Sequence, residues 1–104
     1  MSSIFIHSVY FWLKEGIANE ERANFEKGVN TLLGTPGVIF GKVGKVAPTR
    51  RPVIDSSYDY NLLLVFSSPQ AQDAYQETDE IHKAFIANCN KFWTKVQIYD
   101  SISD

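Results

Sequence analysis

Histidine and tyrosine side chains are the groups in this sequence that could carry acid–base chemistry. The chain has two histidines, His7 and His82, and each falls on an apolar face of an element predicted below. Because imidazole titrates near neutral pH, a partly buried histidine beside a tyrosine can act as a general acid or base. Tyr75 and Tyr60 are the tyrosines expected beside them. A second interpretation stays open, in which each histidine is a buried polar residue satisfied by backbone or water.

The single cysteine, Cys89, is a weaker candidate for chemistry. His82 lies about two helical turns before it on the same predicted helix face, which is too far for a hydrogen bond between thiol and imidazole. We therefore expect Cys89 to pack in the core. One cysteine also excludes an intrachain disulfide, which favours a reducing compartment, and we expect a cytoplasmic protein.

Composition and charge argue against several classes of function. The 104 residues carry a formal net charge of −2, with one basic pair at Arg50–Arg51 in a loop-like stretch, so no nucleic-acid partner is expected. No apolar run is long enough to span a bilayer, and the N-terminus lacks a signal-peptide pattern, so no membrane partner is expected. Two histidines and one cysteine spread over two elements are too few for a zinc site, and we expect neither metal nor cofactor.

The strands that carry these side chains are predicted from β-branched and aromatic runs bounded by turn residues. The second of them is expected to be weakened or bulged at Gly41 and Gly44. Residues 47–57 contain two prolines and are predicted to form a loop. The predicted strands span residues 4–13, 38–46, 58–66 and 93–100.

Two helical regions are predicted from apolar residues at helical spacing. The first covers residues 19–33, with Asn19 as its N-cap and Gly34 at its end. The second begins at Ser68, with Pro69 in the first helical position, and runs through Tyr75. It is interrupted at residues 77–80 and begins again at Thr78 or Asp79.

The resulting order is β-α-β-β-α-β, which predicts one α+β domain over residues 1–104 with a ferredoxin-like fold. Two split β-α-β units then form an antiparallel sheet with both helices on one face. Because side chains alternate along a strand, His7 shares the helix-facing side with Val9 and Phe11, and Tyr60 shares it with Leu62.

The other face of the predicted sheet is also apolar, although the two helices can cover only one side. An exposed apolar patch of this kind is larger than monomers usually tolerate. The simplest cover is the same face of a second copy related by a two-fold axis. A loop folding over the sheet is the alternative, but residues 47–57 offer little beyond Val53 and Ile54 to bury. We therefore expect a homodimer through Ile6, Tyr10, Trp12, Leu63, Val65 and Tyr99.

Several segments resemble the stress-responsive dimeric α/β-barrel (Dabb) family over nearly the whole chain. The matching segments are FIHSVYFWLK at the start, PGV at 36–38, SYDYNLLLVF at 57–66, QDAYQ at 72–76 and FWTKVQIYDS at 92–101. The resemblance implies a ferredoxin-like subunit whose sheet packs on a second sheet to form a dimeric barrel. Most members have no known function, and one plant member is a polyketide cyclase that performs an aldol cyclisation without a cofactor.

The resemblance also implies a pocket between sheet and helices within each subunit. Carried over to this sequence, it places His7, Tyr75 and His82 in acid–base positions, and Tyr60 where the cyclase has another pocket histidine. The segment before His82 lacks the first histidine and the proline of the family's His-Pro-x-His pattern and is one residue longer from Tyr75. The expected ligand-binding residues are Tyr60, Phe25, Val29, Val38, Leu62, Phe85, Val96 and Ile98.

Four functional hypotheses follow from these observations. The first is a homodimeric module that binds a small apolar or aromatic metabolite in this pocket. The alternative is a cofactor-independent enzyme, cyclase-like or lyase-like, in which His82 takes an α-proton with help from Tyr75 while His7 or Tyr60 holds a carbonyl oxygen. A cofactor-independent monooxygenase and a purely structural dimer remain as further possibilities. A Tyr75 hydroxyl within about 3.2 Å of a His82 nitrogen, in an open cavity, favours the enzyme.

Overall fold

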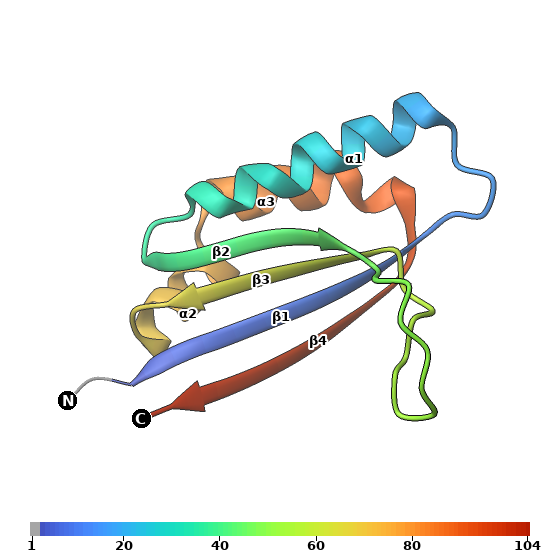
Figure 1. Ribbon diagram of the computed structural model, residues 1–104. Coiled ribbons are helices and arrows are strands. Elements are labelled where there is room, and N and C mark those ends of the chain that lie inside the picture. The colour runs from blue at the N-terminus through green and yellow to red at the C-terminus, as the bar shows by residue number, and fades with distance from the viewer. Residues whose placement is uncertain (1–2) are drawn as a thin grey trace.

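The fold matches the order predicted from the sequence, with two short 3-10 turns in addition (Figure 1). The structure is a computed structural model, and it describes residues 3–104. Along the chain the elements are β1 (Ile4–Leu13), α1 (Asn19–Thr31), η1 (Leu32–Gly34), β2 (Val38–Lys45), β3 (Tyr60–Phe66), α2 (Pro69–Glu77), α3 (Glu80–Cys89), η2 (Asn90–Phe92) and β4 (Trp93–Ser103).

The four strands form one antiparallel sheet in the order β2-β3-β1-β4. Figure 1 shows α1 and α3 lying over one face of this sheet and α2 at the end of the sheet where β1 begins. The predicted ferredoxin-like α+β fold is therefore confirmed. None of the helices in residues 3–104 is long and apolar enough to cross a bilayer.

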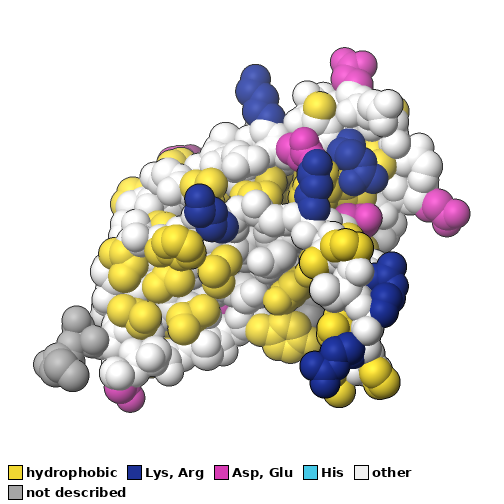
Figure 2. Space-filling model, in the orientation of Figure 1, with side chains coloured by type: hydrophobic (Ala, Val, Ile, Leu, Met, Phe, Trp, Pro, Cys, Tyr) yellow, Lys and Arg dark blue, Asp and Glu magenta, His cyan; other side chains and the backbone are white. Residues whose placement is uncertain are grey.

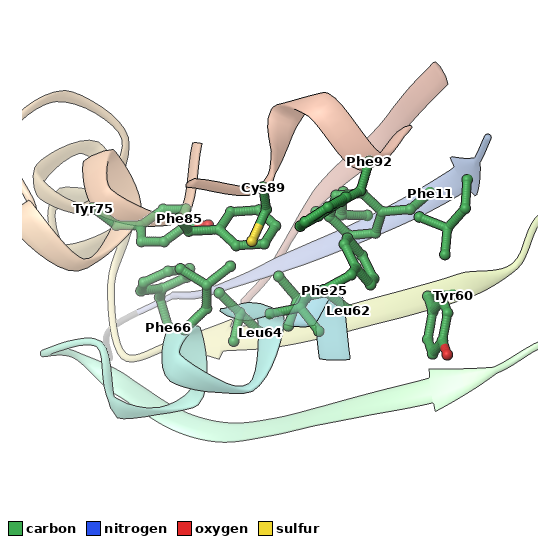
Figure 3. Close-up of a cluster of buried hydrophobic side chains, with 14 residues drawn as sticks. Phe11, Phe25, Tyr60, Leu62, Leu64, Phe66, Tyr75, Phe85, Cys89 and Phe92 are labelled. Atoms are coloured by element: carbon green, nitrogen blue, oxygen red, sulfur yellow. The ribbon is translucent and has the colours of Figure 1, made fainter. Parts of the chain in front are cut away.

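Strand alternation builds the core, as the sequence predicted. The inward side chains of β1 and β3 are buried apart from Phe5, which is partly buried against the core, whereas their neighbours on the other face are only half-buried. Phe25 and Val29 from α1 pack on this layer with no exposed surface. Figure 3 shows the cluster between helices and sheet. The buried inward side chains are His7, Val9, Phe11 and Leu13 from β1 and Tyr60, Leu62, Leu64 and Phe66 from β3.

Two side-chain caps place the polar residues of the second helical region. The Ser68 hydroxyl accepts from the amide of Ala71 at 3.1 Å, which begins α2 as predicted. The Asp79 carboxylate accepts from the amide of Ile81 at 3.2 Å and begins α3. Because the helix is interrupted there, Tyr75 lies near the end of α2 and His82 lies at the start of α3.

The N-cap predicted for α1 is wrong by one residue. Asn19 is the first residue of α1, and Ala18 is the cap. The amide of Ala18 donates to the Glu21 carboxylate at 3.4 Å. A carboxylate in the first turn thus satisfies an amide at this helix end and complements the helix dipole, so no capping side chain at Asn19 is needed.

The bulge in β2 lies at a different position from the one predicted. The register of β2 against β3 shifts between Val38 and Phe40, whereas Gly41 and Gly44 pair regularly. Gly41 instead allows the backbone of β2 to lie close to Leu33, because a Cβ at this position would be 2.9 Å from a methyl carbon of Leu33. The shift turns Phe40 onto the face opposite the helices, where it pairs with Val65 and is 52% exposed.

The face of the sheet opposite the helices is only partly covered by the chain's own loop. The loop before β3 reaches Trp12, whose indole N–H donates to the Ser57 hydroxyl at 3.1 Å, and Tyr58 packs on the Tyr10 ring with centroids 4.8 Å apart. Val53 stays 82% exposed. Figure 2 shows hydrophobic side chains gathered over the strands and beside this loop.

Candidate functional site

A cavity of about 240 Å³ lies between α3 and the half of the sheet formed by β1 and β4. Its aromatic wall consists of Phe11, Phe85 and Trp93, with ring centroids 5.3–5.9 Å apart. Ile86 and Ile98 line it while remaining 38% and 46% exposed, so it opens to solvent between α3 and the edge strand β4. The full lining is His7, Val9, Phe11, Leu32, Leu62, Tyr75, His82, Phe85, Ile86, Trp93, Val96 and Ile98.

His7 is held in the cavity wall by a carboxylate from the neighbouring strand. His7 and Asp100 are paired in the β1–β4 register, and His7 Nδ1 lies 2.6 Å from Asp100 Oδ1. Because an ionised carboxylate only accepts hydrogen bonds, Nδ1 carries the proton in this pair. In the neutral imidazole the other nitrogen, Nε2, is then an acceptor. The pair therefore fixes both the orientation and the tautomer of His7.

Tyr75 packs between the two histidines. Its ring centroid lies 5.6 Å from that of His7 and 4.4 Å from that of His82. Burial, and then the nearby Asp79 carboxylate, raise the pKa of Tyr75, so its hydroxyl stays protonated and can donate. Among residues 3–104, the hydrogen bonds include none between Tyr75 and the His82 ring. These two side chains meet through their rings rather than through a hydroxyl–imidazole bond.

His82 is kept neutral by its surroundings. Burial is the main cause that lowers its pKa, and the nearby His7 lowers it further, while Asp79 and the backbone of Gln76 oppose the shift. A lowered pKa favours the uncharged imidazole at neutral pH, which can accept a proton. The polar side chains that line the cavity are thus two imidazole rings and one phenol that can donate a hydrogen bond.

The structure brings together only part of the residue set expected from the sequence. The three acid–base candidates, His7, Tyr75 and His82, all line the cavity. Four of the expected ligand-binding residues line it as well, namely Leu62, Phe85, Val96 and Ile98.

The other four expected ligand-binding residues lie elsewhere. Phe25 and Val29 are fully buried between α1 and the sheet, and Val38 packs against the core at the start of β2. Tyr60 lies at the end of the core opposite Tyr75 (Figure 3), where its hydroxyl donates to the Glu26 carboxylate. Burial, and then Glu26, raise the pKa of Tyr60.

Sequence reasoning missed Asp100, the partner of His7. Its position in phase with Val96 and Ile98 on the last strand was a usable signal, because it placed a carboxylate on the helix-facing side of β4. The pairing itself depends on the β1–β4 register, which the sequence does not specify. Trp93 and Ile86 were also missed as lining residues, although both belonged to predicted elements.

The fold and cavity define a class of small ferredoxin-like domains with a cavity between sheet and helices. The family model described as the stress-responsive A/B barrel domain matches residues 5–103. The chain belongs to this family, as the resemblance in its sequence implied. No curated protein sequence matches it significantly.

Solved structures of the same fold cover nearly the whole chain. A Dabb family protein from Mesorhizobium loti is 21% identical, with a TM-score of 0.76 and 98% of each chain covered. A dimeric ferredoxin-like protein of unknown function from Thermobifida fusca is 13% identical, with a TM-score of 0.76 and coverage of 97% of this chain and 92% of that one. The hydroxynitrile lyase from Passiflora edulis is 14% identical, with a TM-score of 0.77 and coverage of 97% and 94%.

Proposed function

We propose that this protein is a homodimeric barrel module that binds a small apolar or aromatic metabolite in the cavity between α3 and the sheet. The single observation that carries the proposal is the cavity itself, apolar over most of its wall and polar at His7, Tyr75 and His82. Ligand sites typically combine an apolar lining with a few polar groups that orient the ligand.

The size of the cavity limits the ligand. A volume of about 240 Å³ lies just below the range of roughly 300–1,000 Å³ typical of ligand pockets. An apolar cavity of about 150 Å³ is enough for benzene. A single substituted ring is therefore the expected size, stacked along Phe11, Phe85 and Trp93 with a carbonyl or hydroxyl group at the polar end.

Homodimer formation is part of the proposal. Ile6, Leu63 and Val65 leave apolar surface on the face opposite the helices, and the bulge in β2 adds Phe40 to it. Burying such surface against a second copy is favourable, and a two-fold axis brings identical patches together. The structural neighbour from Thermobifida fusca is described as dimeric, which supports the same arrangement here.

Ligand binding is tested by filling the cavity. We expect phenol or acetophenone to raise the melting temperature of the wild-type protein, because a ligand that binds only the folded state stabilises it. Val96→Trp places an indole in the cavity and should abolish this rise. Val53→Trp is the matched control, since Val53 is 82% exposed in the loop. Absence of any shift in the wild type, or an unchanged shift in Val96→Trp, contradicts binding at this site.

A second candidate function, cofactor-independent acid–base catalysis, is favoured by the pair of His7 and Asp100. A histidine whose Nδ1 is held by a carboxylate at 2.6 Å presents its other nitrogen as a general base in a fixed orientation. Tyr75, kept protonated, could donate to a carbonyl oxygen while the imidazole takes or returns a proton. This set suits proton transfer beside a carbonyl group, or the reversible addition that a lyase performs.

The enzyme hypothesis is tested by turnover with a hydroxynitrile. Cleavage of mandelonitrile moves its hydroxyl proton to a base and releases benzaldehyde and hydrogen cyanide. The benzaldehyde formed is measured by its ultraviolet absorbance. If the protein is a lyase, His7→Gln should abolish cleavage, and Asp100→Asn should lower kcat more than it changes KM. Tyr99→Phe, on the opposite face of β4, serves as the control. Equal turnover in wild type and His7→Gln removes His7 from the mechanism.

A further inference from the structure

A second, smaller hollow lies beside the candidate site and contains polar groups that the proposed function does not use. It has a volume of about 230 Å³ and lies between the turn that precedes β2 and the junction of α2 with α3. Tyr75 is the lining residue it shares with the larger cavity. Its lining is Thr35, Pro36, Ala74, Tyr75, Thr78 and Asp79.

Two of the residues that line this hollow each carry a buried side-chain oxygen without a hydrogen-bond partner. Within residues 3–104 these are Thr35 Oγ1 and Asp79 Oδ2. Thr35 is only 4% exposed. The second oxygen of Asp79 already accepts from the amide of Ile81 at 3.2 Å. Leaving a buried acceptor unpaired is costly, so each of the two oxygens requires a hydrogen-bond donor.

The charges around the hollow favour a cationic donor. Asp79 is an acid, and among the described residues the ion pairs join other side chains, such as Lys83 with Glu80. The last turn of α2 also ends here, with the amides of Thr78 and Asp79 both donating to the carbonyl of Ala74 at 2.9 and 3.0 Å. A helix C-terminus carries partial negative charge and attracts cations. The partly positive N-terminus of α3 begins at the same junction, but the Asp79 carboxylate already caps it, so an anion would meet this carboxylate and the negative end of α2.

The remaining walls indicate an organic cation rather than water or a bare ion. The hollow is several times larger than the roughly 30 Å³ that one water molecule occupies. Pro36 and Ala74 supply apolar surface, and Tyr75 supplies an aromatic ring. Aromatic rings attract ammonium groups. We propose that this hollow is a second ligand site, which takes a small primary amine as its ammonium ion between Asp79 and Thr35.

The proposal is tested with propylammonium chloride as the probe. Its N–H groups can donate to Asp79 and Thr35, and its propyl chain fits against Pro36 and Ala74. Two-dimensional amide NMR titration should shift the signals of Thr35, Thr78 and Asp79 in the wild-type protein. Propanol, tetramethylammonium chloride and sodium chloride at equal ionic strength should shift them much less, because each lacks either the charge, the donor or the organic chain.

Variants at the two oxygens distinguish the site from nonspecific effects. Asp79→Asn should weaken propylammonium binding by about tenfold or more, because the charge-assisted hydrogen bond is lost. Asparagine is as good an N-cap as aspartate, so α3 should be retained. Thr35→Val, which replaces the hydroxyl with a methyl group, should weaken binding independently. Glu80→Gln is the matched control, because it removes an adjacent acidic charge outside the hollow.

Any other result of these titrations contradicts the proposal. No shift with propylammonium means that the hollow holds only water. Equal shifts with sodium chloride mean that it takes a simple ion, and equal shifts with propanol mean that charge is not recognised. Binding that is unchanged in both Asp79→Asn and Thr35→Val places the amine elsewhere on the protein.

Discussion

At the scale of single residues, burial raises the pKa of Tyr75 and lowers the pKa of His82. Both shifts favour the uncharged form, because a low-dielectric environment penalises charge on either side chain. The phenol therefore remains a donor and His82 an acceptor near neutral pH. His7 gains its orientation in a different way, through Asp100 across the β1–β4 pair.

Acidification is expected to destabilise the protein in part through His82. Its pKa is lower in the folded protein than in the unfolded chain, whose value is about 6.5. As pH falls through this window the unfolded chain binds a proton before the folded protein does, so stability falls with pH. Well above this window both states are neutral and His82 contributes nothing.

Urea unfolding at about pH 7 and about pH 5 measures this effect on either side of the usual histidine pKa. The variant His82→Gln should lose less stability between the two conditions than the wild-type protein does. His7 and Asp79 face His82 and remain in both proteins, so the difference reports on His82. An equal loss in the two proteins contradicts the predicted direction.

At the scale of elements, α1 and α3 approach closely at one position, and the glycine there sets their spacing. A Cβ added to Gly28 would clash with the Cys89 sulfur, with Phe85 next nearest at 3.7 Å. Cys89 is buried, as expected from its place in the helix stripe. The residue that was considered as a nucleophile therefore acts as a packing residue against a neighbouring helix.

Gly28→Ala is expected to destabilise the protein although alanine is the better helix former. Alanine gains about 1 kcal/mol of helix propensity, but overpacking against Cys89 costs about 1–3 kcal/mol. Chemical denaturation should show a net loss of roughly 1 kcal/mol, the difference between these two effects.

The clash mechanism predicts a change of sign in a second background. In the Cys89→Ala variant, adding Gly28→Ala should stabilise the protein, because the sulfur is gone and only the propensity gain remains. Gly34→Ala is the control, since a Cβ there meets nothing within 4 Å. Destabilisation of similar size in both backgrounds contradicts the packing explanation.

At the scale of the whole molecule, the sheet has two apolar faces, and the chain covers one of them with helices and the other only in part. Helices α1 and α3 lie on the inner face (Figure 1), while the loop before β3 reaches only the Trp12 end of the other face. Ile6 and Val65 are directly paired at the uncovered end. This distribution is the physical basis for the proposed homodimer.

A charge placed on the uncovered face should prevent dimer formation. Val65→Lys puts an ammonium group opposite Ile6, and burying it without a partner would be strongly unfavourable. Sedimentation velocity at micromolar concentration should show dimers for the wild type and monomers for Val65→Lys, with circular dichroism confirming that the variant is folded. Val53→Lys in the exposed loop should remain dimeric. Single chains in the wild type contradict the proposal.

The sequence by itself determined the order of elements, their inward faces and the helix interruption at Asp79. These features are local, because strand alternation, helical spacing and caps depend on residues close together in the chain. The same alternation placed His7 and Tyr60 on the inner face, and the resemblance in the sequence led to the family that the match over residues 5–103 establishes.

Only the tertiary structure decided which inward residues share a cavity. His7 meets Asp100 because β1 and β4 pair in one register, although the two residues are far apart in the chain. Tyr60 lies on the same face as Leu62 but at the far end of the core, so facing inward did not bring it to the cavity. The bulge that turns Phe40 outward likewise depends on how β2 fits β3. Register and packing bring distant segments together, and the spacing of residues along the sequence does not predict them directly.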